Sequence, residues 1–379
     1  MLAETPNLRF AIDGRMLDRN GTGVSTYARA MRDALVLLGR MPLVVRDAHC
    51  TPYPAAPGRF ERWWRWSETC FDCPRWLWRR RLYARDIFRL AQVHFDRHGT
   101  LLQFHPGGRG VVHWTYPLPL VFAGWTNIYT VHDAIPITHP ELTNIDEVRH
   151  RRLLHRIGER ATRILTVSEA ARQDILRSID LREDQLVACP TGLDIEQPAA
   201  ALPEGLIPGR FLLALGSVEP RKNLTLLAAA HAASGTDMPL VVAGQSGWQG
   251  DVIEGPLASR PDVIRLPFIS RATLLRVVAD ARALLFPTLA EGFGLPIIEA
   301  MHLGTPVMTS TGGATEEVAG GAAMLIDPRS IEAMAAAIAR LARDDALVRQ
   351  LAANGLQRAD NFSLPAFAAR LDAVHRALP

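Results

Sequence analysis

The sequence is poor in lysine: of its 42 lysine and arginine residues, only Lys222 is a lysine. The formal net charge of +3 over 379 residues is small, so the strong basic excess of a nucleic-acid-binding protein is missing. A pyridoxal-dependent phosphorylase needs a lysine for its Schiff base, and here it would have to use this one residue. The surroundings of Lys222 therefore decide whether the protein could be such a phosphorylase.

Cysteine is scarce as well, and long apolar runs are missing. The four cysteines do not make a disulfide framework, although Cys70 and Cys73 form a Cys-x-x-Cys pair. A zinc site would need two further ligands at compatible spacing, so we expect unreactive thiols and no metal. No run approaches the ~18 apolar residues of a spanning helix, and no apolar leader opens the chain. We therefore expect an intracellular, cytoplasmic protein of a reducing compartment.

The chain does contain a repeated alternation of short apolar runs and amphipathic stretches, which is typical of parallel α/β domains. Between 195 and 208 this alternation stops in a segment of Ala, Pro and Gly, which predicts a linker. We predict two doubly wound domains, 1–198 and 199–362, and a helix at 363–379 that either stays with the second domain or crosses back. The expected strands are 8–13, 110–114, 127–131, 164–167, 211–215, 240–243, 263–266, 283–286 and 306–309.

The loop with the most specific pattern runs from Pro287 to Pro296, after an expected strand and before an expected helix. Pro296 suits the first helical turn, which leaves the amides before it free to face an anion or a sugar hydroxyl. Glu291 and Glu299 place carboxylates on both sides of such a ligand; taken alone, they could equally be a capping carboxylate and a solvated helix residue. The candidate groups of the loop are Glu291, Gly292, Phe293, Gly294, Leu295 and Glu299.

A second loop, from Gly216 to Asn223, places Arg221 and Lys222 at the start of a helix that we expect Asn223 to cap. One forked donor and one point cation, both reinforced by the helix dipole, form a clamp for a diphosphate. The alternative is an ordinary basic loop. The metal-binding Asp-x-Asp motif is absent from the sequence, and the two cations and the helix dipole are the groups here that could neutralise a bound diphosphate.

The first domain offers a glycine loop, Gly21, Thr22 and Gly23, before a helix, and a His132-Asp133 pair at the end of an expected strand. The glycine loop can bring backbone amides close to a phosphate or a sugar. A strand-end histidine in isolation is more often structural than functional.

Together these motifs resemble the retaining glycosyltransferases of the two-domain GT-B type, family four (group 1), most closely the bacterial mannosyltransferases of polysaccharide and O-antigen assembly. The resemblance implies two Rossmann-like domains facing a central cleft, with a glycan acceptor in the first and a sugar nucleotide in the second. It implies GDP-mannose as the donor, with UDP- and dTDP-sugars as alternatives, and no cofactor. A non-catalytic sugar-nucleotide-binding partner is the alternative from another class.

By this resemblance His132, Arg221, Lys222 and Glu291 take part in catalysis. His132 would bond the donor sugar, Glu291 its hydroxyl groups and Glu299 the ribose, while the backbone near Phe268 recognises the base. No carboxylate is placed as a nucleophile, so the family suggests a front-face reaction in which the leaving phosphate takes the acceptor's proton. The implied donor-binding residues are Gly21, Thr22, Gly23, Gly216, Arg221, Lys222, Phe268, Glu291, Gly292, Phe293, Gly294, Leu295 and Glu299.

Residues 59–89 depart from the family pattern and hold five tryptophans among nine arginines. Indole rings and arginines together favour a membrane interface, where the arginines attract anionic lipid. This interpretation places the protein at the inner face of the plasma membrane, near a polyprenyl-diphosphate-linked glycan. A partly buried helical hairpin and a dimer contact are the alternatives.

Overall fold

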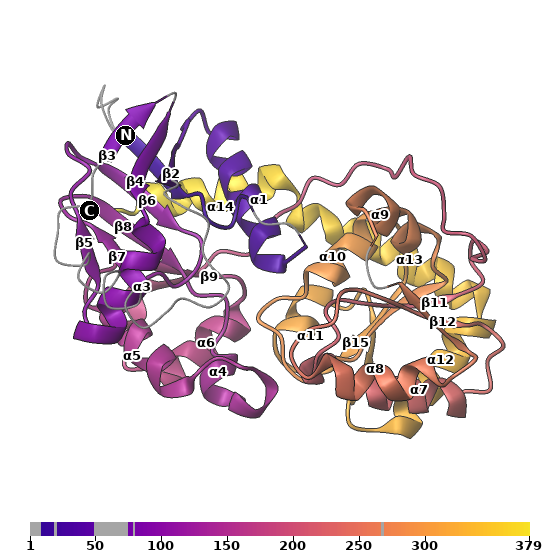
Figure 1. Ribbon diagram of the computed structural model, residues 1–379. Coiled ribbons are helices and arrows are strands. Elements are labelled where there is room, and N and C mark those ends of the chain that lie inside the picture. Colours follow the sequence, from indigo (N-terminus) through magenta and orange to yellow (C-terminus); the bar gives the residue numbers. More distant parts are fainter. Residues whose placement is uncertain (1–8, 19–20, 49–74, 79, 267–268) are drawn as a thin grey trace.

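The computed structural model describes residues 9–18, 21–48, 75–78, 80–266 and 269–379. Its main strands form one eight-stranded sheet in the first half of the chain and one six-stranded sheet in the second. Helices pack beside both sheets, and the two halves lie side by side as separate lobes (Figure 1). The predicted pair of α/β domains is confirmed.

The first sheet has the order β10-β9-β8-β6-β1-β2-β4-β3, and all of its pairs are parallel except β3 with β4. The carboxyl ends of β1, β6 and β8 are therefore adjacent at one edge, where ligand sites of α/β domains lie. The bounds are β1 Arg9–Asp13, β2 Leu43–Ala48, β3 Arg75–Trp78, β4 Arg81–Arg85, β6 Gly110–Trp114, β8 Thr126–Thr130, β9 Arg163–Thr166 and β10 Leu186–Ala188, with β5 Leu102–Phe104 and β7 Leu120–Phe122 as a separate pair.

The helices of the first domain begin at polar caps that the sequence provides. Thr22, Asp146 and Ser168 each accept a hydrogen bond from a free amide of the first helical turn. Ser168 caps α6 by accepting from the amide of Ala171 at 3.0 Å. The helices are α1 Gly23–Leu37, α3 Ile87–His98, α4 Ile135–Thr138, α5 Glu147–Gly158 and α6 Glu169–Ser178.

The second sheet is entirely parallel, in the order β13-β12-β11-β14-β15-β16. Its central strands are buried on both faces, which explains their continuous apolar sequences. The strands are β11 Leu212–Leu215, β12 Leu240–Ala243, β13 Val263–Leu266, β14 Ala283–Phe286, β15 Val307–Ser310 and β16 Met324–Ile326. The helices are α7 Leu224–Ala233, α8 Gly250–Ala258, α9 Arg271–Asp280, α10 Leu295–His302, α11 Gly313–Ala319, α12 Ile331–Arg343 and α13 Asp345–Ala359.

The last helix, α14 (Leu364–Arg376), lies against the first domain beside α1 (Figure 1). The rings of Tyr27 and Phe367 are 6.1 Å apart, and Arg370 donates to the carbonyl oxygen of Pro190. Of the two placements that the sequence allowed, the helix therefore crosses back. One apolar core runs through both domains, from Ile12 on β1 to Leu213 on β11, while each sheet has a second core on its other face.

The described part of the Trp- and Arg-rich segment is not a helical hairpin. β3 and β4 pair in antiparallel fashion and extend the first sheet beyond β2, and α3 begins at Ile87. The helical alternative is therefore wrong for residues 75–78 and 81–85. Residues 59–74 and 79 lie outside the described residues.

Candidate active site

The two domains meet where the loop after β14 touches the loop after β8. A Cβ atom on Gly292 would lie 2.5 Å from the carbonyl oxygen of His132 and 3.1 Å from Oδ2 of Asp133. A Cβ on Gly23 would be 3.4 Å from the Leu295 side chain, so the glycine loop of the first domain approaches the same place. The Glu291 loop is thus brought together with the two candidate motifs of the first domain.

Arg221 and Lys222 both donate to the same atom, Oε1 of Glu291. Arg221 also forms an ion pair with Glu219 at 2.6 Å, and the Lys222 ammonium lies 4.5 Å from the centre of the Phe286 ring. Lys222 is buried, with 7% of the residue exposed. The predicted basic pair therefore exists, but in this structure a carboxylate occupies its donors.

The charges of this cluster set the ionisation of Glu291. Burial alone would raise its pKa, but the neighbouring Lys222 and Arg221 hold the pKa below its usual value. Asp133 behaves differently, because burial raises its pKa to about 6 against the opposing effects of the Ile135 amide and Arg221. The pKa values of the two carboxylates are thus shifted in opposite directions, below the usual value for Glu291 and up to about 6 for Asp133.

The backbone of the Glu291 loop has the conformation that the sequence predicts. Gly294 has φ +102°, a left-handed value that favours glycine, and Pro296 lies in the first turn of α10. In the part of the chain that the structure describes, the amides of Phe293 and Gly294 donate no hydrogen bond to protein. The Phe293 ring is buried against Phe362, so only its backbone is available to a ligand.

Glu299 is buried inside α10, so its interpretation as a solvated helix residue is wrong. It forms an ion pair with Arg271 at 2.8 Å, and Arg271 is the first residue of α9. No sequence pattern singled out Arg271, because only the fold brings α9 beside α10. Phe268, the predicted base-recognition position, lies outside the described residues together with residue 267.

The loop from Gly216 to Asn223 differs from the prediction in one respect. Asn223 precedes α7 but makes no cap; its side-chain amide donates to the carbonyl oxygens of Pro287 and Pro328. It therefore ties the basic loop to the Glu291 loop. Gly216 has φ +130°, and a Cβ there would lie 3.1 Å from Lys222 Cε, so glycine leaves room for the lysine side chain.

His132 is held by neighbours within the first domain. Its Nε2 lies 2.9 Å from the carbonyl oxygen of Thr115, and the Tyr27 ring packs edge-on at 4.9 Å. Burial lowers the pKa of His132 to about 4, so the ring is neutral at pH 7. Thr22 of the glycine loop is engaged in a capping box with Ser25, whereas Gly21 has φ +83° and open space around it.

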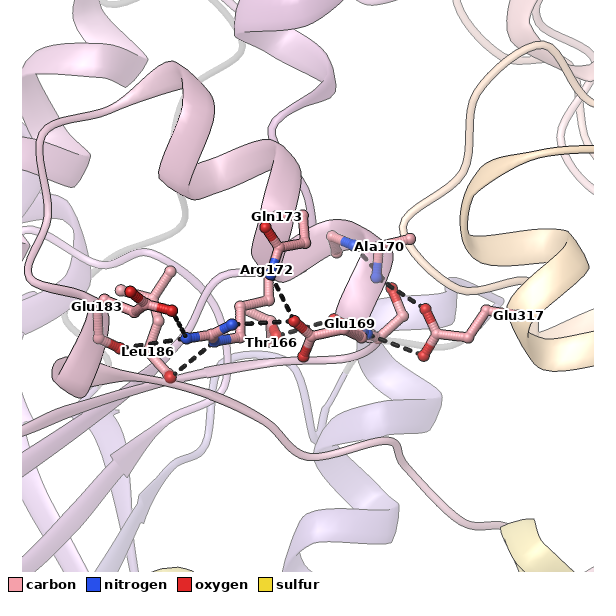
Figure 2. Close-up of polar contacts among 10 residues, drawn as sticks. Thr166, Glu169, Ala170, Arg172, Gln173, Glu183, Leu186 and Glu317 are labelled. Atoms are coloured by element: carbon pink, nitrogen blue, oxygen red, sulfur yellow. Dashed lines mark hydrogen bonds and ion pairs between the residues drawn. The ribbon is translucent and has the colours of Figure 1, made fainter.

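A polar contact that the sequence did not predict joins α6 to the second domain. The carboxylate of Glu317, on α11, accepts hydrogen bonds from the amides of Glu169 and Ala170 at 2.9 and 2.7 Å (Figure 2). Ser168, which caps the same helix, donates to the carbonyl oxygen of Gly292 at 2.7 Å. The N-terminus of α6 thus holds both α11 and the Glu291 loop.

The side chain of Glu169 points away from Glu317 and is bound within the first domain (Figure 2). It accepts from Arg172 and Gln173, and Arg172 also binds Glu183. The carboxylate of Glu169 is therefore held by partners on its own helix.

Among the described residues there is no group of three His, Cys, Asp or Glu side chains suited to a metal ion. The same residues include no helix with the length and hydropathy to cross a membrane. The described cysteine, Cys189, is buried, and burial raises the pKa of its thiol to about 12.

A known protein family matches the second domain. Residues 209–344, which hold Arg221, Lys222, Glu291 and Glu299, match the family described as Glycosyl transferases group 1. Residues 209–344 therefore form a glycosyl transferases group 1 domain. The match confirms the group 1 part of the predicted family, on the domain that carries the basic pair and both glutamates.

Two curated relatives of this chain are mannosyltransferases. The O-antigen chain mannosyltransferase B of Escherichia coli is 34% identical over 253 residues, which cover 62% of this chain and 66% of that protein. The serotype-specific mannosyltransferase WbdA of Escherichia coli is 25% identical over 66% of this chain, but only 33% of that protein is covered. The matches thus span less than two thirds of these relatives.

Solved structures confirm the predicted GT-B fold. The sucrose-phosphate synthase of Thermosynechococcus elongatus superimposes with a TM-score of 0.72 at 20% identity, covering 98% of this chain and 99% of that one. The Anabaena Alr3699/HepE protein, described in complex with UDP and glucose, has a TM-score of 0.70 at 16% identity and covers 98% of this chain and 100% of its own. At these identities the likeness concerns the fold alone.

Proposed function

We propose that this chain is a retaining mannosyltransferase that moves mannose from GDP-mannose to a glycan acceptor in cell-surface polysaccharide synthesis. The observation that carries the proposal is the contact of the Glu291 loop with the His132-Asp133 loop, with Arg221 and Lys222 directly behind Glu291. The names of the curated relatives support mannose as the sugar and O-antigen chains as the kind of product.

The basic pair would bind the diphosphate of the donor. In the structure both cations share Glu291, so a diphosphate would compete with this carboxylate for their N–H groups. The freed carboxylate of Glu291 then becomes an acceptor for hydroxyl groups of the sugar. A ligand that has both a diphosphate and sugar hydroxyls satisfies all partners, whereas a bare anion leaves a buried carboxylate without donors.

The transfer itself would use the leaving diphosphate as its base. The bond between the anomeric carbon and the diphosphate oxygen breaks while the acceptor oxygen bonds to the same carbon from the same face. The acceptor's proton passes to the departing phosphate oxygen, so configuration is retained. Arg221, Lys222 and the free amides of the Glu291 loop would stabilise the developing negative charge, and the proposal includes no metal.

A thermal-shift screen with GDP-mannose, UDP-glucose and dTDP-glucose, each in EDTA, tests the donor. We expect GDP-mannose to raise the melting temperature most, and a shift with UDP-glucose alone would reject mannose transfer. Lys222→Ala should weaken donor binding about 10- to 100-fold, because a buried hydrogen bond to a charged group is lost. The matched control is Arg349→Ala, which removes an exposed cation from the same domain.

Turnover separates an enzyme from a non-catalytic binding partner. Release of GDP in the presence of a mannan-type acceptor, with an axial C1 linkage in the NMR spectrum of the product, supports retaining transfer. Tight binding without release of nucleotide, across a range of acceptors, supports the non-catalytic alternative.

The acceptor would be linked to a polyprenyl diphosphate, and residues 59–89 would place the enzyme at the inner face of the plasma membrane. The composition of this segment supports the proposal. Flotation with anionic liposomes tests it, using a variant in which Trp63, Trp64 and Trp66 are replaced by Ser. Unchanged flotation of that variant would reject the membrane contact.

A further inference from the structure

A series of buried hydrogen bonds in the first domain connects Asp13 with His132 of the candidate active site. Asp13, the last residue of β1, is fully buried, and its Oδ2 accepts hydrogen bonds from the amide and the hydroxyl of Thr115 at 2.6 and 2.7 Å. The carbonyl oxygen of Thr115 in turn accepts from His132 Nε2 at 2.9 Å. The three residues meet because β1, β6 and β8 are neighbours in the sheet and end at the same edge.

These hydrogen bonds determine which nitrogen of His132 carries its proton. A carbonyl oxygen can only accept, so Nε2 must be the protonated atom. A neutral imidazole has a single N–H, and burial lowers the pKa of His132 to about 4, which keeps the ring neutral at pH 7. Nδ1 is then a bare acceptor, and it has no hydrogen-bond donor among the residues that the structure describes.

Thr115 cannot turn without loss, because all of its polar groups have a partner. Its amide and hydroxyl bind Asp13 and its carbonyl binds His132, and the residue is fully buried. Without Asp13, two buried donors would lack an acceptor, and the carbonyl would lose its fixed direction. The edge-on ring of Tyr27 fixes the plane of the imidazole. Asp13 is thus connected to His132 although the two side chains share no hydrogen bond.

We propose that Asp13 is a positioning residue, which acts through Thr115 to hold His132 protonated on Nε2 and to present Nδ1 as an acceptor for a hydroxyl group of the sugar. His132 is well placed for this, since its carbonyl oxygen faces Gly292 of the donor-domain loop. The identity of the ligand as a sugar rests on the proposed function. The proton position is a property of the protein without any ligand.

The proton position is measured by ¹⁵N NMR of the ligand-free protein labelled on histidine, with His132 assigned from its loss in His132→Gln. We expect a protonated Nε2 and a bare Nδ1 at pH 7.5. Asp13→Ala should give a mixture of tautomers, Asp13→Asn should restore the wild-type state in part because it returns an acceptor oxygen, and the exposed Asp180→Asn should change nothing. A wild-type proton on Nδ1, or an unchanged tautomer in folded Asp13→Ala, would overturn the proposal.

If Asp13→Ala does not fold, Thr115→Ala and Thr115→Ser replace it. The serine keeps the hydroxyl that binds Asp13, so we expect the wild-type tautomer with serine and a mixture with alanine. The same tautomer in both variants would overturn the proposed role of the Asp13-Thr115 contact.

Kinetics test the use of Nδ1. In His132→Asn the amide oxygen would lie near the position of Nδ1, whereas in His132→Gln the amide N–H would lie near the position of Nε2. His132→Asn should therefore keep about tenfold more turnover than His132→Gln, corresponding to one hydrogen bond to the substrate. Equal loss in both variants would overturn the acceptor role. Absence of transfer with every sugar nucleotide would reject the proposed function instead, while the NMR result would still decide the positioning.

Discussion

The two domains are joined on two sides, and the two connections differ in chemistry. On one side α14 packs on the first domain with buried rings and aliphatic side chains, including Phe367 and Leu371, both fully buried. Two backbone segments also bond to each other there, since the amide of Leu193 donates to the carbonyl oxygen of Phe362 at 2.8 Å. On the other side, the N-terminus of α6 binds Glu317 and Gly292 through directional hydrogen bonds.

These two kinds of contact respond differently to domain motion. Apolar contact is roughly proportional to buried area and tolerates small rotations, while a hydrogen bond weakens steeply when its geometry changes. We therefore expect the α14 side to act as a hinge and the α6 side to separate when ligands enter or leave. The four variants below test the apolar contacts on the α14 side and the hydrogen bonds on the α6 side, beginning with the largest expected effect.

Phe367→Ala removes a fully buried ring from the apolar side. We expect a loss of ~3–5 kcal/mol in the free energy of unfolding, because a cavity remains in the core that both domains share. Urea unfolding measures it. Leu356→Ala, at a half-exposed position of α13, is the control, and an equally small loss in both variants would argue against an interdomain core.

Glu317→Ala removes the acceptor of two hydrogen bonds on the polar side. We expect a loss of about 1–2 kcal/mol in stability, since the contact is partly exposed, and a larger radius of gyration in solution scattering. Glu204→Ala, an exposed carboxylate of the linker, should change neither quantity. An unchanged radius for Glu317→Ala would show that this contact does not hold the domains together.

His375→Gln should make stability less dependent on pH. His113 and His375 face each other at 2.8 Å between β6 and α14, and burial lowers their pKa values to about 3 and about 2. Between pH 6.5 and pH 3 the unfolded chain therefore binds more protons, so stability is complete above pH 6.5 and falls with pH, by at most ~1.4 kcal/mol per pH unit for each histidine. Parallel melting-temperature curves for variant and wild type from pH 7.5 to 5 would contradict this.

Ser168→Ala should have the smallest effect. It removes the cap of α6 and the donor to the Gly292 carbonyl, and a lost cap costs ~1 kcal/mol. Hydrogen exchange of the first turn of α6 should accelerate, while Ser168→Thr, which keeps the hydroxyl, should behave as wild type. Slow exchange in the alanine variant would mean that Glu317 alone orders this helix end.

The sequence predicted the fold where local rules decide it. Leu240–Ala243 and Ala283–Phe286 are strands with the predicted ends, because strands buried on both faces are continuous apolar runs. β3 and β4 were not predicted, since strands rich in Arg and Trp lack that pattern. The helical alternative was wrong there because these residues pair as strands at the edge of the first sheet.

The site was predictable to the extent that its residues stand at strand ends. Glu291, Arg221, Lys222 and His132 all follow buried strands, where parallel sheets place their ligands. Glu317 was missed because one of its partners, the amide of Ala170, lies 147 positions earlier in the sequence. Arg271 was missed because its partner, Glu299, lies on another helix, with β14 between the two helices in sequence. The side chain of Asn223 was misread as a cap because its two carbonyl partners are distant in sequence.

Gly292 provides a way to perturb the closed arrangement of the molecule. Its lack of a side chain lets the His132 carbonyl approach to where a Cβ would lie only 2.5 Å away. A single methyl group at this position would act as a wedge, which pushes the lobes apart without removing any charge or catalytic group. Gly292→Ala is therefore the substitution with which to trap and study an open form of the enzyme.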